Sequence, residues 1–82
     1  MRNFKISIDL SSIYLELSHL NMREYTKPFM LVFIEAANPD DACITVIRRI
    51  ISQIMNNGDS LENRIICQRV KRLIRIERVQ SL

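Results

Sequence analysis

Apolar and polar side chains alternate along the first part of the chain. Residues 4–10 place an apolar side chain at every even position, and the alternation resumes over residues 13–17, there at odd positions. A period of two is typical of strands that bury one face. We therefore predict two strands joined as a hairpin at Ser11–Ser12, although Ser–Ser lacks the residues that favour tight hairpin turns. In that register the apolar side chains of both strands share one face.

A longer apolar run follows a polar segment. Residues 19–28 are mostly polar and end in a proline, which predicts a loop. Residues 29–34 have the sequence FMLVFI and are apolar at every position. A strand that is apolar on both sides is normally covered on both faces, so the pattern predicts a central strand of the sheet.

The segment after this strand carries helix signals at both ends. Asn38 is a favourable N-cap, Pro39 suits the first helical position, and the two acidic residues that follow match the positive end of a helix dipole. Apolar side chains then recur on one half of the helix circumference. Asn57–Gly58 ends the pattern, because glycine readily adopts the left-handed conformation that closes a helix. We predict a helix over residues 39–56.

Basic and branched apolar side chains dominate residues 61–79. Asp59 or Ser60 offers a second N-cap just before them. At the helical repeat the apolar side chains gather opposite the basic ones, whereas a strand would mix both kinds on each face. We therefore predict a helix over residues 61–72. The two-residue alternation that follows favours a short strand over residues 74–79.

These elements predict an α+β fold in a single domain covering residues 1–82. Their order along the chain is β-β-β-α-α-β, and we expect a small, mostly antiparallel sheet with two helices packed on one face. A chain of 82 residues buries only about 60–65% of the surface that its unfolded form exposes. Apolar residues nevertheless make up 48% of this chain. The apolar content therefore favours a protein whose surface is partly covered by a partner or a second copy.

Charge is unevenly distributed along the sequence. Residues 1–60 hold six Lys and Arg against seven Asp and Glu, a net charge of −1, and residues 61–82 hold six against two, a net charge of +4. A basic end on a nearly neutral body suggests an acidic partner, such as nucleic acid or an acidic protein surface. We call the predicted contact residues the basic stripe. They are Arg64, Gln68, Lys71, Arg72, Arg75 and Arg78.

The sequence offers little for catalysis or cofactor binding. A single glycine excludes the glycine-rich phosphate loops, and His19, Cys43 and Cys67 are too far apart in sequence for a zinc motif. Two isolated cysteines in apolar segments are typical of reduced core thiols, which favours a cytoplasmic location. Asp40 and Asp41 also oppose a thiolate at Cys43. We expect a protein that is no enzyme and that needs no cofactor and no metal.

The remaining sequence features concern partners. The amino-terminal residues lack the apolar core of a secretory signal, and FMLVFI, the longest apolar run, is far too short to span a bilayer, so we expect no membrane partner. The sequence predicts a small non-catalytic binding protein, an assembly component that self-associates or joins a larger complex through its basic carboxyl-terminal helix. The alternative is a nucleic-acid-binding regulatory protein whose basic stripe contacts phosphates. Asn63, Arg64 and Gln68 are the only residues near the start of this helix that suit contacts with base edges.

Overall fold

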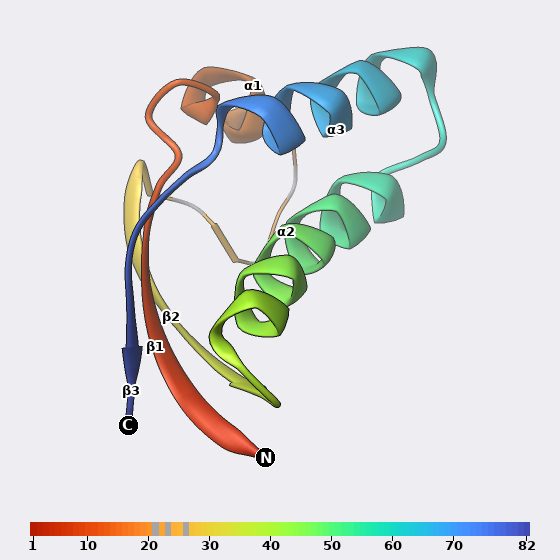
Figure 1. Cartoon of the computed structure of the whole chain (residues 1–82). Helices are drawn as coiled ribbons and strands as arrows, with labels where there is room; N and C mark the ends of the chain where they lie inside the picture. The colour runs from red at the N-terminus through yellow and green to blue at the C-terminus, as the bar shows by residue number, and fades with distance from the viewer. Residues whose placement is uncertain (21, 23, 26) are drawn as a thin grey trace.

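Strands and helices alternate along most of the chain. The computed structural model describes residues 1–20, 22, 24–25 and 27–82. Its elements are β1 (Arg2–Asp9), α1 (Tyr14–Ser18), β2 (Phe29–Ala36), α2 (Pro39–Asn56), α3 (Leu61–Leu73) and β3 (Arg75–Ser81). The α+β class and the antiparallel sheet predicted from the sequence are confirmed (Figure 1).

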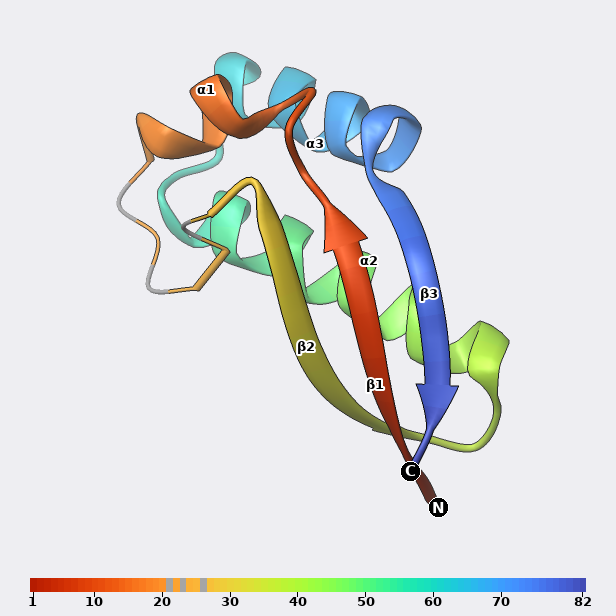
Figure 2. The same cartoon turned by 90° about the vertical axis from the view of Figure 1, so that its left-hand side faces the viewer.

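The sheet has the strand order β2-β1-β3, so the amino-terminal strand lies in the middle. Figure 2 shows β1 between its two neighbours, with the helices behind the sheet. All helices lie on this one side, which we call the inner face (Figure 1). α2 packs across the inner face, and α3 packs against α2 near the end of the sheet where α1 lies. The opposite, outer face carries no other element among the described residues.

The core lies between the inner face and the helices. The even-numbered residues of β1 are buried from Phe4 onward, as the alternation over residues 4–10 predicts. α2 opposes them with buried residues spaced four apart, which is the spacing of one helix face. Fully covered side chains of the core include Phe4, Ile6, Ile8, Leu10, Ile13, Val46, Ile50, Ile54 and Val70. Cys67 is buried as predicted, and Cys43 is partly buried.

The predicted hairpin is wrong, because its second strand is helix α1. Asp9 Oδ1 accepts the N–H of Ser11 at 2.8 Å, in a local turn that leads the chain away from the sheet. Ile13 and Leu17 are buried, while Leu15 between them is 73% exposed. Buried positions four residues apart are typical of a helix, and so the same apolar pattern serves a helical turn. The element order is therefore β-α-β-α-α-β.

The prediction that residues 29–34 form a central strand is also wrong. β2 pairs with β1 on one side only, which makes it an edge strand. Its even-numbered residues face the core, whereas Phe29, Leu31 and Phe33 are 64%, 54% and 65% exposed on the outer face. The central position belongs to β1, whose buried side alone is apolar.

The two long helices begin and end close to the predicted residues. Asn38 caps α2 through its side chain, and Gly58 adopts a φ of +128° after the last turn of that helix. Ser60 caps α3 in the same way. β3 spans residues 75–81, where the sequence predicted a strand over 74–79.

The described residues between α1 and β2 belong to no helix or strand, as predicted for residues 19–28. Residues 21, 23 and 26 of that predicted loop lie outside the described residues. Tyr25 is buried, and Gln53 Nε2 of α2 donates to Glu24 Oε2 at 2.9 Å. This part of the loop therefore packs against the helix layer.

Candidate functional site

The outer face of the sheet presents a different kind of side chain on each strand. Because side chains alternate between the two faces of a strand, the residues next to the buried positions point outward. Their strand pairing aligns them in rows. The rows are Phe33–Lys5–Gln80, Leu31–Ser7–Arg78 and Phe29–Asp9–Arg75. The outer face is therefore apolar along β2, polar or charged along β1 and mainly basic along β3.

We call Phe29, Leu31 and Phe33 the β2 stripe. Each side chain is more than half exposed, and the three are neighbours on one face of one strand. Single exposed apolar residues are ordinary, whereas contiguous ones mark interaction surfaces. Burying one large apolar side chain contributes about 1.5–3 kcal/mol relative to full exposure. A partner that covers the β2 stripe would therefore gain several kcal/mol from this contact.

Among the described residues, no strand pairs with the β2 edge that lies beside the stripe. The N–H of Leu10 donates to the Pro28 carbonyl at 2.7 Å, and the N–H of Leu82 donates to the Asn3 carbonyl at 2.9 Å. Combined with the antiparallel register, these bonds show that even-numbered residues of β1 bond to β2 and odd-numbered ones to β3. The even-numbered residues of β2 therefore bond to β1. The N–H and C=O groups of residues 29, 31, 33 and 35 point to the open edge.

The two edges of the sheet differ in how they are protected. β3 carries Arg75, Glu77 and Arg78, and its pairing with β1 skips Glu77 in a bulge. Charges and bulges are the devices that keep an edge strand from pairing with another chain. β2 has no charged residue and no proline between residues 29 and 34. Among the two edges, only that of β2 is suited to accept a further strand.

The six residues of the basic stripe do not form one surface. Arg64, Gln68, Lys71 and Arg72 belong to α3, whereas Arg75 and Arg78 belong to β3 and lie on the outer face. α3 is on the other side of the sheet (Figure 1). The stripe is divided because α3 ends at residue 73, and the residues beyond it follow the two-residue period of a strand. A contact between these residues and a partner stays a prediction.

Two arginines of α3 are engaged by acidic side chains of the same chain. Arg64 forms a two-point pair with Asp59 at 2.7 and 2.9 Å, and these hydrogen bonds hold the pKa of Asp59 below its ordinary value. Arg69 Nη2 and Nε contact Glu16 Oε1 on α1 at 2.7 and 2.9 Å. These pairs neutralise part of the positive charge of α3.

Asn63 has a structural role in place of the base contact considered from the sequence. The residue is only 8% exposed, and its Nδ2 donates to the Gly58 carbonyl at 2.7 Å and to the Ile54 carbonyl at 3.5 Å. Its side chain thus links the first turn of α3 to the end of α2. Gln68 is exposed on α3.

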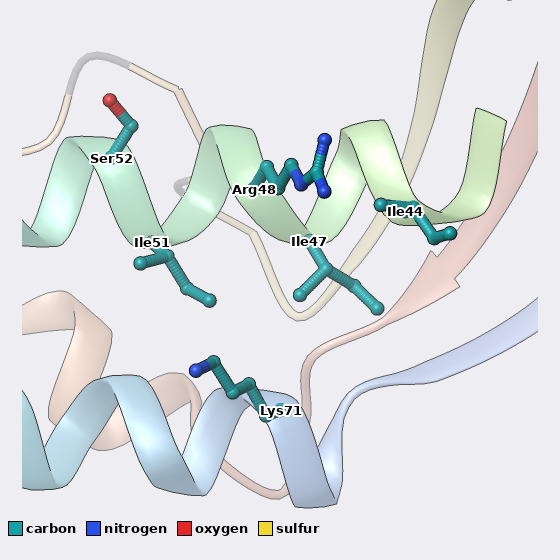
Figure 3. A pocket seen from close by; sticks show the side chains of 6 residues that line it. All are labelled: Ile44, Ile47, Arg48, Ile51, Ser52 and Lys71. Atoms are coloured by element: carbon teal, nitrogen blue, oxygen red, sulfur yellow. The ribbon is translucent and has the colours of Figure 1, made fainter. Parts of the chain in front are cut away.

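A hollow of about 490 Å³ lies between α2 and α3. Figure 3 shows Ile47 and Ile51 pointing from α2 toward α3, and Lys71 reaching from α3 toward α2. Ile44, Arg48 and Ser52 complete the lining. An apolar floor beside two cations suits an apolar group that carries negative charge.

Both cysteine thiols have a raised pKa, which disfavours the thiolate form. Burial raises the pKa of Cys43, and Asp40 adds to the rise in the direction predicted from the sequence. Burial also raises the pKa of Cys67. Within the described ranges, no three His, Cys, Asp or Glu residues are placed to hold a metal ion. No helix in the same ranges has the length and apolar character needed to cross a bilayer.

Sequence reasoning missed the β2 stripe because it assigned both faces of FMLVFI to the interior. A usable signal was present in Pro28, since proline beside a strand is typical of an edge position. The charged residues that bracket the run, Lys27 and Glu35, point the same way. Comparison with known proteins gives no further guide, because no family model, no curated protein and no solved structure matches this chain.

Proposed function

We propose that this protein is a small non-catalytic interaction module that assembles with protein through β2. The observation that carries the proposal is the β2 stripe, in which three large apolar side chains are exposed beside an unprotected strand edge. An edge of this kind offers backbone hydrogen bonds for affinity and side chains for specificity. The helices leave this surface uncovered (Figure 2).

The energetics favour association through this surface. Phe29, Leu31 and Phe33 are 54–65% exposed. A partner that covers them therefore gains roughly 1–1.5 kcal/mol of binding free energy at each position. Association costs several kcal/mol in lost translational and rotational freedom. Backbone hydrogen bonds along the edge supply the additional stabilisation that a specific complex needs.

Three polar residues of α3 form a second predicted contact. Gln68, Lys71 and Arg72 are exposed on the helix, away from the β2 stripe. In this proposal they face an acidic surface of the larger assembly. Their contribution acts mainly on the rate and the salt dependence of binding, because exposed charges are screened by salt.

Binding of single-stranded nucleic acid is the second candidate function. The fold places Phe29 and Phe33 on the same face as Lys5, Arg75 and Arg78, so aromatic rings and cations share one surface. Stacking of bases on aromatic rings beside cations is how many sheets bind single strands. Asp9 on the same face, and the position of the rings on an edge strand, favour the protein partner over this candidate.

Sedimentation velocity tests the two candidates together. We expect self-association or association with a protein partner to persist between about 50 mM and about 500 mM salt, because apolar contacts respond weakly to ionic strength. The double substitution Phe29→Ser/Phe33→Ser should abolish it. The matched control is Leu61→Ser/Ile65→Ser, which removes two exposed apolar side chains from α3.

Nucleic-acid binding gives a different result in the same experiment. A labelled single-stranded oligonucleotide should then bind with an affinity that falls steeply with salt. The substitutions Arg75→Ser and Arg78→Ser should weaken that binding. Association that requires the oligonucleotide and vanishes at high salt would refute the proposed protein-interaction function.

A further inference from the structure

We propose that the partner of β2 is β2 of a second copy of this chain, paired antiparallel about a two-fold axis at Leu31. This inference rests on the proposed function and names its partner. The pairing joins two three-stranded sheets into one continuous sheet of six strands. The result is a closed dimer with the same surface used by both copies.

The backbone geometry of β2 permits this pairing without disturbing the existing sheet. The outward N–H and C=O groups belong to the odd-numbered residues, so Leu31 can exchange both hydrogen bonds with Leu31 of the second copy. Phe29 then lies opposite Phe33 on each side of the axis. The missing N–H of Pro28 is no obstacle, because the hydrogen-bonding side of this even-numbered residue faces β1.

The charges on either side of the apolar run at residues 29–34 select this register, once the pairing is continued to Lys27, just before β2. With Leu31 opposite itself, Lys27 lies opposite Glu35 of the second copy, and the pair occurs twice by symmetry. Shifting the axis by one residue in either direction places Lys27 opposite Phe33, or Phe29 opposite Glu35. Shifting it by two places Leu31 opposite one of the two charges. Among these registers, only the one centred on Leu31 pairs apolar with apolar residues and unlike charges with each other.

Space is available beside the edge for the incoming strand. A hollow of about 300 Å³ is lined by Met30 to Phe33 of β2, by Glu24 and Tyr25, and by Arg49 of α2. In an antiparallel pair, the even-numbered residues of the second strand point to this inner side. Met30 and Val32 of the second copy would therefore lie over the hollow, where each meets Val32 or Met30 of the first.

Amide hydrogen exchange followed by NMR tests the pairing in the unmodified chain. The N–H groups of residues 30, 32 and 34 bond to β1 and should exchange slowly at every concentration. Those of residues 29, 31, 33 and 35 face the open edge and should exchange rapidly at about 10 µM protein. We expect their exchange to slow about tenfold or more at about 1 mM, as dimer forms. Exchange rates at these four positions that stay constant while dimer forms would overturn the inference.

Charge exchange tests the register. Either Lys27→Glu or Glu35→Lys places like charges opposite each other at two sites, and we expect the dimerisation constant to weaken by roughly tenfold. The double substitution Lys27→Glu/Glu35→Lys restores unlike pairs and should recover the original affinity. The control Glu62→Lys changes an exposed charge on α3 and should leave dimerisation unchanged.

The outcomes separate this inference from the function on which it rests. A dimer that needs Phe29 and Phe33 but leaves the odd-numbered amides unprotected indicates sheets packed face to face, which overturns the edge pairing and retains the assembly function. A monomer at about 1 mM overturns the second copy as partner. Failure of the double charge exchange to restore affinity overturns the register centred on Leu31.

Discussion

Asn63→Asp is a sharp test of how the two long helices are joined. The substitution preserves side-chain size but replaces the Nδ2 donor with an oxygen. That oxygen would face the carbonyls of Gly58 and Ile54, which now accept hydrogen bonds from Asn63 at 2.7 and 3.5 Å. Two carbonyl oxygens would then face a carboxylate. This carboxylate would be buried, because residue 63 is only 8% exposed.

The substitution has two unfavourable effects and one favourable effect on the free energy of unfolding, and the unfavourable ones are larger. Loss of the shorter hydrogen bond, with an unsatisfied carbonyl left behind, costs about 1–2 kcal/mol, and burying the unpaired charge adds about 1–2 kcal/mol. The position lies in the first turn of α3, where the helix dipole favours a carboxylate by about 0.5 kcal/mol. The balance predicts a loss of roughly 2–3 kcal/mol at pH 7. For a domain of this size, that lowers Tm by roughly 10–20 °C.

Urea unfolding followed by circular dichroism measures this loss directly. The introduced carboxyl has a raised pKa in the folded state, so its deficit is full at neutral pH and shrinks as the pH falls through that pKa. Once protonated, its hydroxyl can donate to the Gly58 carbonyl again. Gln68→Glu, the same amide-to-acid change at an exposed position of α3, should stay within about 0.5 kcal/mol of the parent chain. If Asn63→Asp matched that control at pH 7, the assigned role of the Asn63 side chain would be wrong.

Two further predictions concern charged contacts around β1 and α1. Hydrogen bonds from Ser11, aided by the charge of Arg75, hold the pKa of Asp9 below its ordinary value. The ionised Asp9 therefore contributes to stability above about pH 4, and this contribution is lost as the pH falls through the folded pKa. Asp9→Asn should therefore lose less stability between about pH 5 and pH 2 than the parent chain, and equal urea midpoints over that range would contradict this. Arg69→Met should destabilise by about 0.5–1 kcal/mol, since its pair with Glu16 is partly exposed. A double-mutant cycle with Glu16→Gln that gives no coupling energy would contradict it.

The two long helices could be predicted because their signals are local. The cap of α2 at Asn38 and the cap of α3 at Ser60 each use a side chain three residues away from its bonding partner. The positive φ of Gly58 likewise depends on that residue alone. Because such short-range contacts set the helix boundaries, the neighbouring residues are sufficient to predict them.

The hairpin was predicted wrongly, and the edge position of β2 had only Pro28 and the flanking charges as local signals, because both features depend on distant parts of the chain. Residues 13–17 carry apolar side chains at every second position, yet only Ile13, just before α1, and Leu17 lie in the core. β1 finds its partners in β2 and β3, and β3 begins more than 60 residues later. The alternation along a strand indicates which of its faces is apolar, but it does not indicate which strands will pair with it.

The candidate site was missed for a related reason. The basic stripe was treated as one contact surface, although the strand predicted over residues 74–79 already held Arg75 and Arg78. In the structure these two residues lie in β3, on the outer face of the sheet. There they lie on the same face as the β2 stripe, with β1 between them. The residues of a surface built from three strands are not contiguous in the sequence, so no local pattern predicts that surface.

The contrast between the two sheet edges bears on the kind of assembly that this fold can form. If both edges accepted strands, copies would add without limit and produce fibres. The bulge at Glu77 and the charges of β3 block one edge, and the other edge is open. Pairing through β2 consumes the single open edge of each copy, so strand addition stops at two copies. An unprotected apolar edge favours fibre formation in a chain with two open edges. In this chain, with one open edge, it is compatible with a sheet that ends at two copies.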